Sequence, residues 1–279
     1  MTQSDGMVFA FSYAWWEGPP LKAALNTKLK ESSMNMLKKV ALAAALTVST
    51  MSAALADPQT IGGVTWDPDY PLDFSSSSVQ IQQFIQPDGS LRGFGFVSTI
   101  NGYGQSEFCS TGCELTFKFS GYTPIATAGN TTTYTGGIVQ IFRNDGPSTI
   151  NPNDPTTMND GNTGLGELWL SLAGATFNGG TLLGTINAIN PPNLSGLGQL
   201  DVVGGLAAAA FDTNQQVGGS DLSFSTSFTQ PFPGEGISHV AGTGNFFGQS
   251  LQVVPEPGSL ALMGLGLLGL AQIRRRKQK

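Results

Sequence analysis

Several stretches of the chain alternate apolar and polar residues one by one, and this alternation limits the fold more than any other feature. In the segment 114–122, ELTFKFSGY, apolar residues occupy every second position from Leu115 to Phe119. The segments 166–177 and 221–228 follow the same rule. A period of two places successive side chains on opposite faces of an extended strand. The pattern therefore predicts antiparallel strands with one apolar and one polar face.

Other apolar runs, separated by clusters rich in Gly, Pro, Asn and Ser, extend this prediction. Further strand candidates are 79–85, 93–100, 136–142, 181–186, 199–203 and 244–254. The segment 206–214, LAAAAFDTN, favours a short helix instead. We predict an all-β fold for residues 57–253, an antiparallel β-sandwich or a jelly-roll-like domain. No repeat of fixed period is visible, which disfavours a propeller or a solenoid.

Residues 34–56 have the three-part pattern of a secretory signal peptide. Two lysines precede a short apolar core, and small residues follow as far as Ala54 and Ala56. Such an Ala-x-Ala sequence fits signal peptidase, so we expect a signal helix that is cleaved before Asp57. The alternative is a buried or amphipathic N-terminal helix, which would not need these features in this order.

Residues 1–33 precede the signal pattern, although a signal is normally read from the N-terminus itself. We expect translation to begin at Met34 or Met36. Residues 1–33 are then a wrongly assigned upstream start or a disordered extension, and we assign them no function.

The segment expected to be exported is strongly acidic. Residues 57–273 contain three cationic side chains against 16 acidic ones, a net charge of −13, whereas the whole chain carries −6. Such a surface cannot neutralise a phosphate backbone, so nucleic acid is excluded as a partner on electrostatic grounds. Cationic partners, divalent metals and neutral polymers are compatible with this charge.

The two cysteines, Cys109 and Cys113, enclose three residues that include a glycine. An even count in an exported protein predicts a disulfide, and so small a loop would stabilise the fold by about 2 kcal/mol. A zinc site would need more thiol or imidazole ligands, and the chain has one histidine, His239. A redox dithiol usually has two intervening residues. We predict a structural disulfide.

No catalytic constellation is apparent in the sequence. A Ser-His-acid triad would have to use His239, and no G-x-S-x-G motif supplies the nucleophile. The paired carboxylates of a glycoside hydrolase stay open, because folding brings such groups together. However, Glu107, Glu114 and Glu167 lie in or beside predicted strands without distinguishing context. We predict that the protein is not an enzyme.

Aromatic side chains offer a route to carbohydrate binding. Trp66, Tyr70 and Trp169 could each stack against a sugar ring if they face solvent. Burial in the core is the more common fate of such residues.

The loop 143–167 is rich in Asn and Asp, whose side-chain oxygens are the ligand type that calcium prefers. The candidate calcium ligands are Asp145, Asp154 and Asp160. EF-hand spacing is not met, since placing Gly161 at the sixth loop position puts Met158 where an oxygen ligand is required. The alternative is that these are turn residues in a solvated loop. We expect no other cofactor.

The C-terminal residues 254–279 combine an extended segment, a short apolar run and a basic end. Prolines at 255 and 257 favour an extended backbone. The apolar run 259–273 would form roughly 22 Å of helix, against about 30 Å of membrane core. The four basic residues that follow, Arg274, Arg275, Arg276 and Lys277, belong on the cytoplasmic side. We predict a short transmembrane helix, with an ordinary single-pass anchor as the alternative.

This tail resembles a known sorting signal. The motif Val254, Pro255, Glu256 and Pro257, the glycine-studded apolar run and the terminal arginines are similar to the PEP-CTERM signal of Gram-negative envelope proteins. The resemblance covers about 26 residues and the signal peptide expected with them. It implies processing by exosortase, a membrane transpeptidase-like enzyme of bacteria that also make exopolysaccharide. Because ectodomains in this family vary, it implies little about residues 57–253.

Together these features predict an exported protein. We expect it to be anchored in the membrane facing the periplasm before processing, and then to lie at the cell surface or outside the cell. Its expected partners are signal peptidase, exosortase, the membrane and exopolysaccharide. The favoured function is a non-enzymatic envelope or biofilm-matrix protein. The alternative is a carbohydrate-binding module or glycoside hydrolase, which two carboxylates about 5 to 10 Å apart in an aromatic groove would favour.

Overall fold

The computed structural model describes residues 57–69, 73–109, 112–146, 149–151 and 153–251. All of them belong to the second of two compact units, Ala54–Lys279, and the first unit is Met1–Ala53. The expected signal helix and the expected C-terminal membrane helix lie outside the described residues. No helix among the described residues is long and apolar enough to cross a membrane.

The described residues form strands with a few short helical turns, which confirms the all-β prediction. The strands are β1 (Gln59–Ile61), β2 (Val64–Trp66), β3 (Phe74–Ile85), β4 (Leu91–Ile100), β5 (Tyr103–Gly104), β6 (Glu114–Ala128), β7 (Thr131–Asn144), β8 (Glu167–Ala175), β9 (Leu182–Ile189), β10 (Pro192–Gly204), β11 (Leu222–Pro231) and β12 (His239–Gly248). The helical turns are α2 (Gln105–Phe108), α3 (Ala208–Phe211), η1 (Pro155–Thr157) and η2 (Val217–Gly219). The helix expected within 206–214 is α3.

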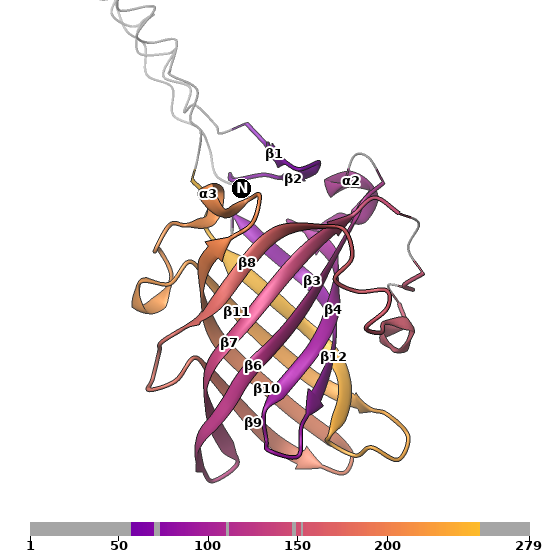
Figure 1. Cartoon of the computed structure of the whole chain (residues 1–279), viewed down its shortest axis with the longest axis vertical. Coiled ribbons are helices and arrows are strands. Elements are labelled where there is room, and N and C mark those ends of the chain that lie inside the picture. The colour runs from indigo at the N-terminus through magenta and orange to yellow at the C-terminus, as the bar shows by residue number, and fades with distance from the viewer. Residues whose placement is uncertain (1–56, 70–72, 110–111, 147–148, 152, 252–279) are drawn as a thin grey trace, which may run out of the picture. The chain divides into compact units, whose positions relative to one another are not determined.

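The long strands form one antiparallel sheet that closes on itself. Its order is β11-β12-β3-β4-β6-β7-β8-β10, and β10 pairs in turn with β11 from Leu194 to Leu200 (Figure 1). Strands β8 and β9 share one place in the sheet, between β7 and β10. Strand β8 pairs with residues 138–143 of β7 and 199–204 of β10, and β9 pairs with residues 131–134 of β7 and 192–198 of β10. The prediction of a β-sandwich or jelly roll is therefore wrong: one closed sheet replaces two packed sheets.

Local irregularities explain how the sheet closes. Register shifts interrupt the ladders, for example between Val202 and Gly204 where β10 pairs with β8. A bulge bends a strand and increases its twist, which lets the two edges of a tilted sheet meet. Apolar and polar residues alternate in the same way in a sandwich, because both architectures bury one face of each strand. Alternation alone therefore cannot distinguish them.

Aromatic rings inside the sheet lie over glycines of the neighbouring strand. In the β4–β6 ladder, Gly93 is paired with Phe119 and Gly95 with Phe117. A Cβ atom added to Gly95 would lie 2.1 Å from the Phe117 ring. Gly198 of β10 is related in the same way to Phe224 of β11. These inward-facing rings thus need a glycine, with no side chain, on the strand opposite them.

A cluster of aromatic side chains fills the end of the sheet nearest β1 and β2. Trp66, Phe74, Trp169 and Phe211 contact one another, with 4.9 Å between the ring centroids of Trp66 and Phe211. The Trp169 indole N–H donates to the carbonyl of Ile61 at 2.9 Å. Figure 1 shows β1, β2, α2 and α3 gathered at this end, which we call the capped end. The opposite end, where β3 turns into β4 and β6 into β7, is the hairpin end.

The first and last described segments meet at the capped end. The side-chain amide of Gln59 donates to the carbonyl of Leu251 at 2.7 Å. The Trp66 indole N–H donates to the Ser250 hydroxyl at 2.9 Å, and this hydroxyl donates to the Asp73 carboxylate at 3.0 Å. Trp66, Ser250 and Asp73, which are linked by these hydrogen bonds, are all buried. The described domain therefore ends beside the strand with which it begins.

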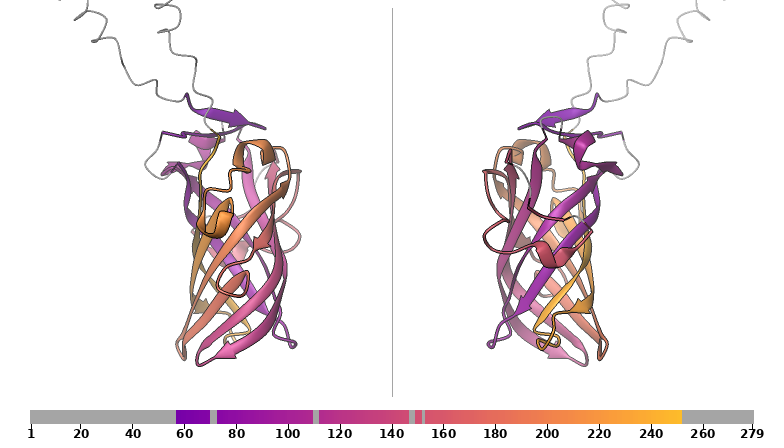
Figure 2. Two further views of the ribbon diagram at one scale, coloured as in Figure 1. Left: turned by 90° about the vertical axis from the view of Figure 1, so that its left-hand side faces the viewer. Right: turned by 90° about the vertical axis from the view of Figure 1, so that its right-hand side faces the viewer.

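A second apolar cluster lies on the outer face of the sheet. Phe94 and Phe96 project outward from β4 and are covered by Ile150 and Met158. Gln82, which is 2 % exposed, fixes this covering segment by donating to the carbonyl of Met158 at 3.0 Å. The segment lies against the outside of the sheet in the right-hand view of Figure 2. Residues 93–97, GFGFV, are consequently buried on both faces.

Candidate functional site

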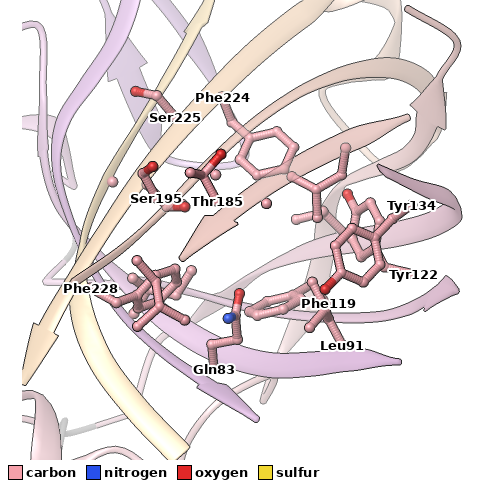
Figure 3. Close-up of a pocket in the computed structure, with 18 of the residues that line it drawn as sticks. Gln83, Leu91, Phe119, Tyr122, Tyr134, Thr185, Ser195, Phe224, Ser225 and Phe228 are labelled. Atoms are coloured by element: carbon pink, nitrogen blue, oxygen red, sulfur yellow. The ribbon is translucent and has the colours of Figure 1, made fainter. Parts of the chain in front are cut away.

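The interior of the closed sheet contains a cavity between the aromatic cluster and the hairpin end. Its volume is about 60 Å³, counted as the space open to the centre of a water-sized sphere. Strands from all around the sheet contribute to its wall, as Figure 3 shows. Its apolar lining includes Ile81, Leu91, Phe119, Leu182, Phe224 and Phe228.

The lining of this cavity carries no formal charge. None of the described residues that line it is Asp, Glu, Lys, Arg or His. Its polar side chains are neutral and include Gln83 of β3, whose amide projects into the cavity in Figure 3. The arrangement favours contact with neutral, mainly apolar chemistry, since an ion placed there would lose its hydration without gaining a counter-charge.

Tyr122 is the most unusual group in the lining. Its side chain is 1 % exposed, its ring lies over Gly137, and its buried hydroxyl has no hydrogen-bond partner among the described residues. Burial raises the pKa of Tyr122, so the hydroxyl stays protonated under physiological conditions. A buried hydroxyl without a partner is destabilising, and such groups call for an explanation.

The burial of the lining side chains differs along the cavity. Gln83, Ile85 and Ile186, which lie toward that end, are partly buried, whereas Phe117 is 1 % exposed. The aromatic cluster closes the other end. The less buried part of the lining therefore lies away from the point where the described domain begins and ends.

The sorting and cleavage residues expected from the sequence fall largely outside the structure. Residues 254–257, 274–277, Ala54 and Ala56 lie outside the described residues. Asp57, the expected first residue of the mature protein, is described and exposed. Signal cleavage at this position stays a prediction.

The disulfide prediction is confirmed. Cys109 and Cys113 are bonded, and their side chains are 1 % and 0 % exposed. Cys109 also forms an isolated β-bridge with Val64 of β2. The bond thus fixes the turn after α2 against the strand that carries Trp66.

Replacing both cysteines by alanine is expected to lower the free energy of unfolding by about 2 kcal/mol, because the short closed loop restrains the unfolded chain. Urea unfolding of the purified exported protein measures this change. Reduction of the parent protein should reproduce it, and reduction of the double variant should have no effect. An unchanged midpoint after loss of the bond would show that it is dispensable.

The three candidate calcium ligands have other partners in the structure. Asp145 pairs with Arg143 at 2.6 Å, and Asp154 accepts hydrogen bonds from the backbone and hydroxyl of Thr156. Asp160 lies 3.4 Å from Arg92. Among the residues that the structure describes, no three Asp, Glu, His or Cys side chains form a group that could hold a metal ion. Calcium binding by loop 143–167 stays a prediction.

His239 is held in an aromatic stack. Its ring lies between those of Phe84 and Phe232, with centroids 4.0 Å and 3.6 Å away. Its Nε2 atom is hydrogen-bonded to the side-chain oxygen of Gln82 at 2.9 Å. Desolvation lowers the pKa of His239, Arg92 adds to this effect, and Glu235 opposes it. The geometry matches a structural histidine that links β12 to β3.

The lowered pKa of His239 predicts a fall in stability as the pH drops through about 6.5. The unfolded chain takes up a proton near the usual histidine pKa of about 6.5, while the folded protein resists protonation. Thermal melts at intervals between pH 7.5 and pH 6 should show a decreasing melting temperature, and His239→Gln should flatten that decrease. Equal slopes for the two proteins would refute the assignment.

The aromatic and glutamate candidates for carbohydrate chemistry that the structure describes do not line the cavity. Trp66 and Trp169 are 1 % and 0 % exposed and belong to the core, while Tyr70 lies outside the described residues. Glu107 accepts a hydrogen bond from the Gly104 backbone and Glu114 one from the Asn144 amide. Neither these glutamates nor Glu167 lines the cavity.

Comparison with known proteins identifies the tail. Residues 253–277 match the family model of the PEP-CTERM protein-sorting motif. The chain carries a PEP-CTERM sorting motif. The match includes Val254, Pro255, Glu256 and Pro257, which confirms the resemblance seen in the sequence. The motif implies an exported protein that passes the membrane, is processed by exosortase and is sorted to the cell surface.

The PEP-CTERM match covers the tail alone. Neither the curated proteins nor the solved structures contain a match to the chain.

Proposed function

We propose that the protein is a non-enzymatic component of the cell envelope or the extracellular matrix. In this account, residues 34–56 direct export, and exosortase acts on the PEP-CTERM tail to deliver the closed sheet to the surface. The observation that carries the proposal is the sorting motif at residues 253–277. A surface protein needs a durable fold and a defined point of attachment, and the domain supports both requirements.

The closed sheet supports durability outside the cell. Because β10 pairs with β11, the part of the main sheet that the structure describes closes on itself, and closure removes the free edges that could pair with another chain. The buried Cys109–Cys113 bond adds a restraint that persists in an oxidising compartment.

The position of the first and last described residues supports attachment at one end of the domain. The described residues stop at Leu251, which is hydrogen-bonded to Gln59 at the capped end. A tether that continues from this point would leave the hairpin end exposed to the surroundings.

The charge of the domain supports a matrix made of neutral or cationic polymer. With −13 over residues 57–273, the surface repels polyanions and stays soluble at high local concentration. Exopolysaccharide of low charge is the partner that we infer. The alternative of a dedicated carbohydrate site gains no support from Trp66 and Trp169, since both are buried.

Co-sedimentation with exopolysaccharide isolated from the producing bacterium tests this role. The exported protein should sediment with the polymer in moderate salt, and a strain without the protein should yield matrix of altered cohesion. A protein that stays in the supernatant, from cells whose matrix is unchanged by its loss, would contradict the proposal.

A further inference from the structure

We propose that the cavity inside the closed sheet is a binding site for a small neutral molecule with a slender apolar body and one hydrogen-bonding oxygen. A primary alcohol of moderate chain length is the simplest member of this class. The inference concerns the interior of the sheet and goes beyond the proposed envelope role, which depends on the tail and the outer surface.

The wall of the cavity favours an apolar occupant. Rings and aliphatic side chains from several strands face it, and Gly184, Gly196 and Gly244 add no side chain to its space. Transfer of an alkyl group from water into such surroundings is favourable by about 0.8 kcal/mol for each buried CH₂ group.

Tyr122 supplies the polar contact. Its hydroxyl is buried and has no hydrogen-bond partner among the described residues, although it belongs to a side chain that lines the cavity. A ligand oxygen that reaches this hydroxyl would accept its proton in a hydrogen bond, and an alcohol could also donate to it. Such a contact would satisfy the buried hydroxyl.

The absence of charge in the described lining selects against ions. A carboxylate would have to give up its hydration in a cavity that offers no cationic side chain. The net charge of −13 over residues 57–273 further disfavours the approach of anions. A neutral alcohol should therefore bind better than the fatty acid of the same length.

The size of the cavity limits the ligand. One water needs roughly 10 to 15 Å³ of volume measured in this way. The cavity of about 60 Å³ therefore accommodates a linear ligand of roughly four to six groups, each the size of a water molecule. This corresponds to a chain of about six carbon atoms. A wider ring system would require the walls to move.

Titration of the exported protein with 1-hexanol and with hexanoate, followed by amide chemical shifts in NMR, tests the proposal. Hexanol should produce saturable shifts concentrated at Gly184, Gly196 and Gly244, with hexanoate at least tenfold weaker at pH 7.5. Tyr122→Phe should weaken hexanol binding about five- to tenfold. It should also raise the melting temperature of the ligand-free protein, since it removes the unpartnered hydroxyl.

A blocking variant and a matched control complete the experiment. Ile186→Trp enlarges a partly buried lining side chain and should abolish hexanol binding. Leu197→Trp makes a similar change on the exposed outer face of β10 and should leave binding unchanged. Scattered shifts that do not saturate, equal binding of hexanoate, or full binding by Ile186→Trp would overturn the proposal. If Ile186→Trp does not fold, Tyr122→Phe and the hexanoate comparison still decide it.

Discussion

Gly95→Ala is expected to lower the free energy of unfolding by about 3 kcal/mol, the upper range for an overpacked core. The added Cβ would lie 2.1 Å from the Phe117 ring and 2.5 Å from the carbonyl oxygen of Gln80. The ring cannot retreat without disturbing the aromatic interior, and the carbonyl belongs to β3, which is paired with β4. Urea unfolding of the exported protein measures the loss.

Gly204→Ala is the matched control, because it makes the same chemical change in β10 where no atom lies within 4 Å of the added Cβ. Its stability should stay within about 0.5 kcal/mol of the parent. Introducing Phe117→Leu into Gly95→Ala should recover part of the loss, as expected for residues in contact. Equal effects of the two alanine substitutions would show that the aromatic-over-glycine packing is not what limits the interior.

Replacing Pro255, Glu256 and Pro257 together by alanine is expected to reduce the amount of protein delivered to the surface at least tenfold. The three residues lie within the matched sorting motif. Alanine permits a helix, whereas the two prolines favour an extended backbone. The changed segment would then extend the apolar helix expected to follow it. Quantitative blotting of membrane, surface and medium fractions measures the effect.

The matched control changes residues of the same kind within the described domain. Pro233→Ala with Glu235→Ala alters an exposed loop between β11 and β12 and should leave delivery unchanged. In cells without exosortase, the parent protein should behave like the sorting variant and remain in the membrane fraction. Unaltered delivery of the variant would separate the motif from sorting.

The strands were predictable because their signal is local. Leu115, Phe117 and Phe119 alternate with polar residues, and all three face the interior as expected. Closure of the sheet was not predictable in this way. It depends on the pairing of β10 with β11 and on bulges, neither of which changes the period of the sequence.

The cavity and the role of Tyr122 were harder to predict, because they depend on contacts between residues far apart in the sequence. In strict alternation after Leu115, Phe117 and Phe119, Tyr122 would face outward. A register shift in the β4–β6 ladder places Tyr122 opposite Leu91, and its side chain faces the interior instead. The segment 114–122 ends in Gly121 and Tyr122, and a glycine in a strand can signal such a bulge. The lack of a partner for the hydroxyl could be seen only in three dimensions.

The tail was predictable because sorting signals are read as linear sequence. The motif 254–257, the apolar run and the basic end are contiguous, and the family match at residues 253–277 confirms their meaning. In contrast, the possible sugar contacts at Trp66 and Trp169 depended on exposure, and the fold buries both side chains.

Mass spectrometry of the native protein recovered from the cell surface or the medium tests the central claim most directly. We infer that the acidic domain is exported and sorted through its C-terminal motif. The mature protein should begin at Asp57 and should lack the basic residues 274–277. An intact chain from Met1 to Lys279, recovered in folded form from the cytosol, would contradict it.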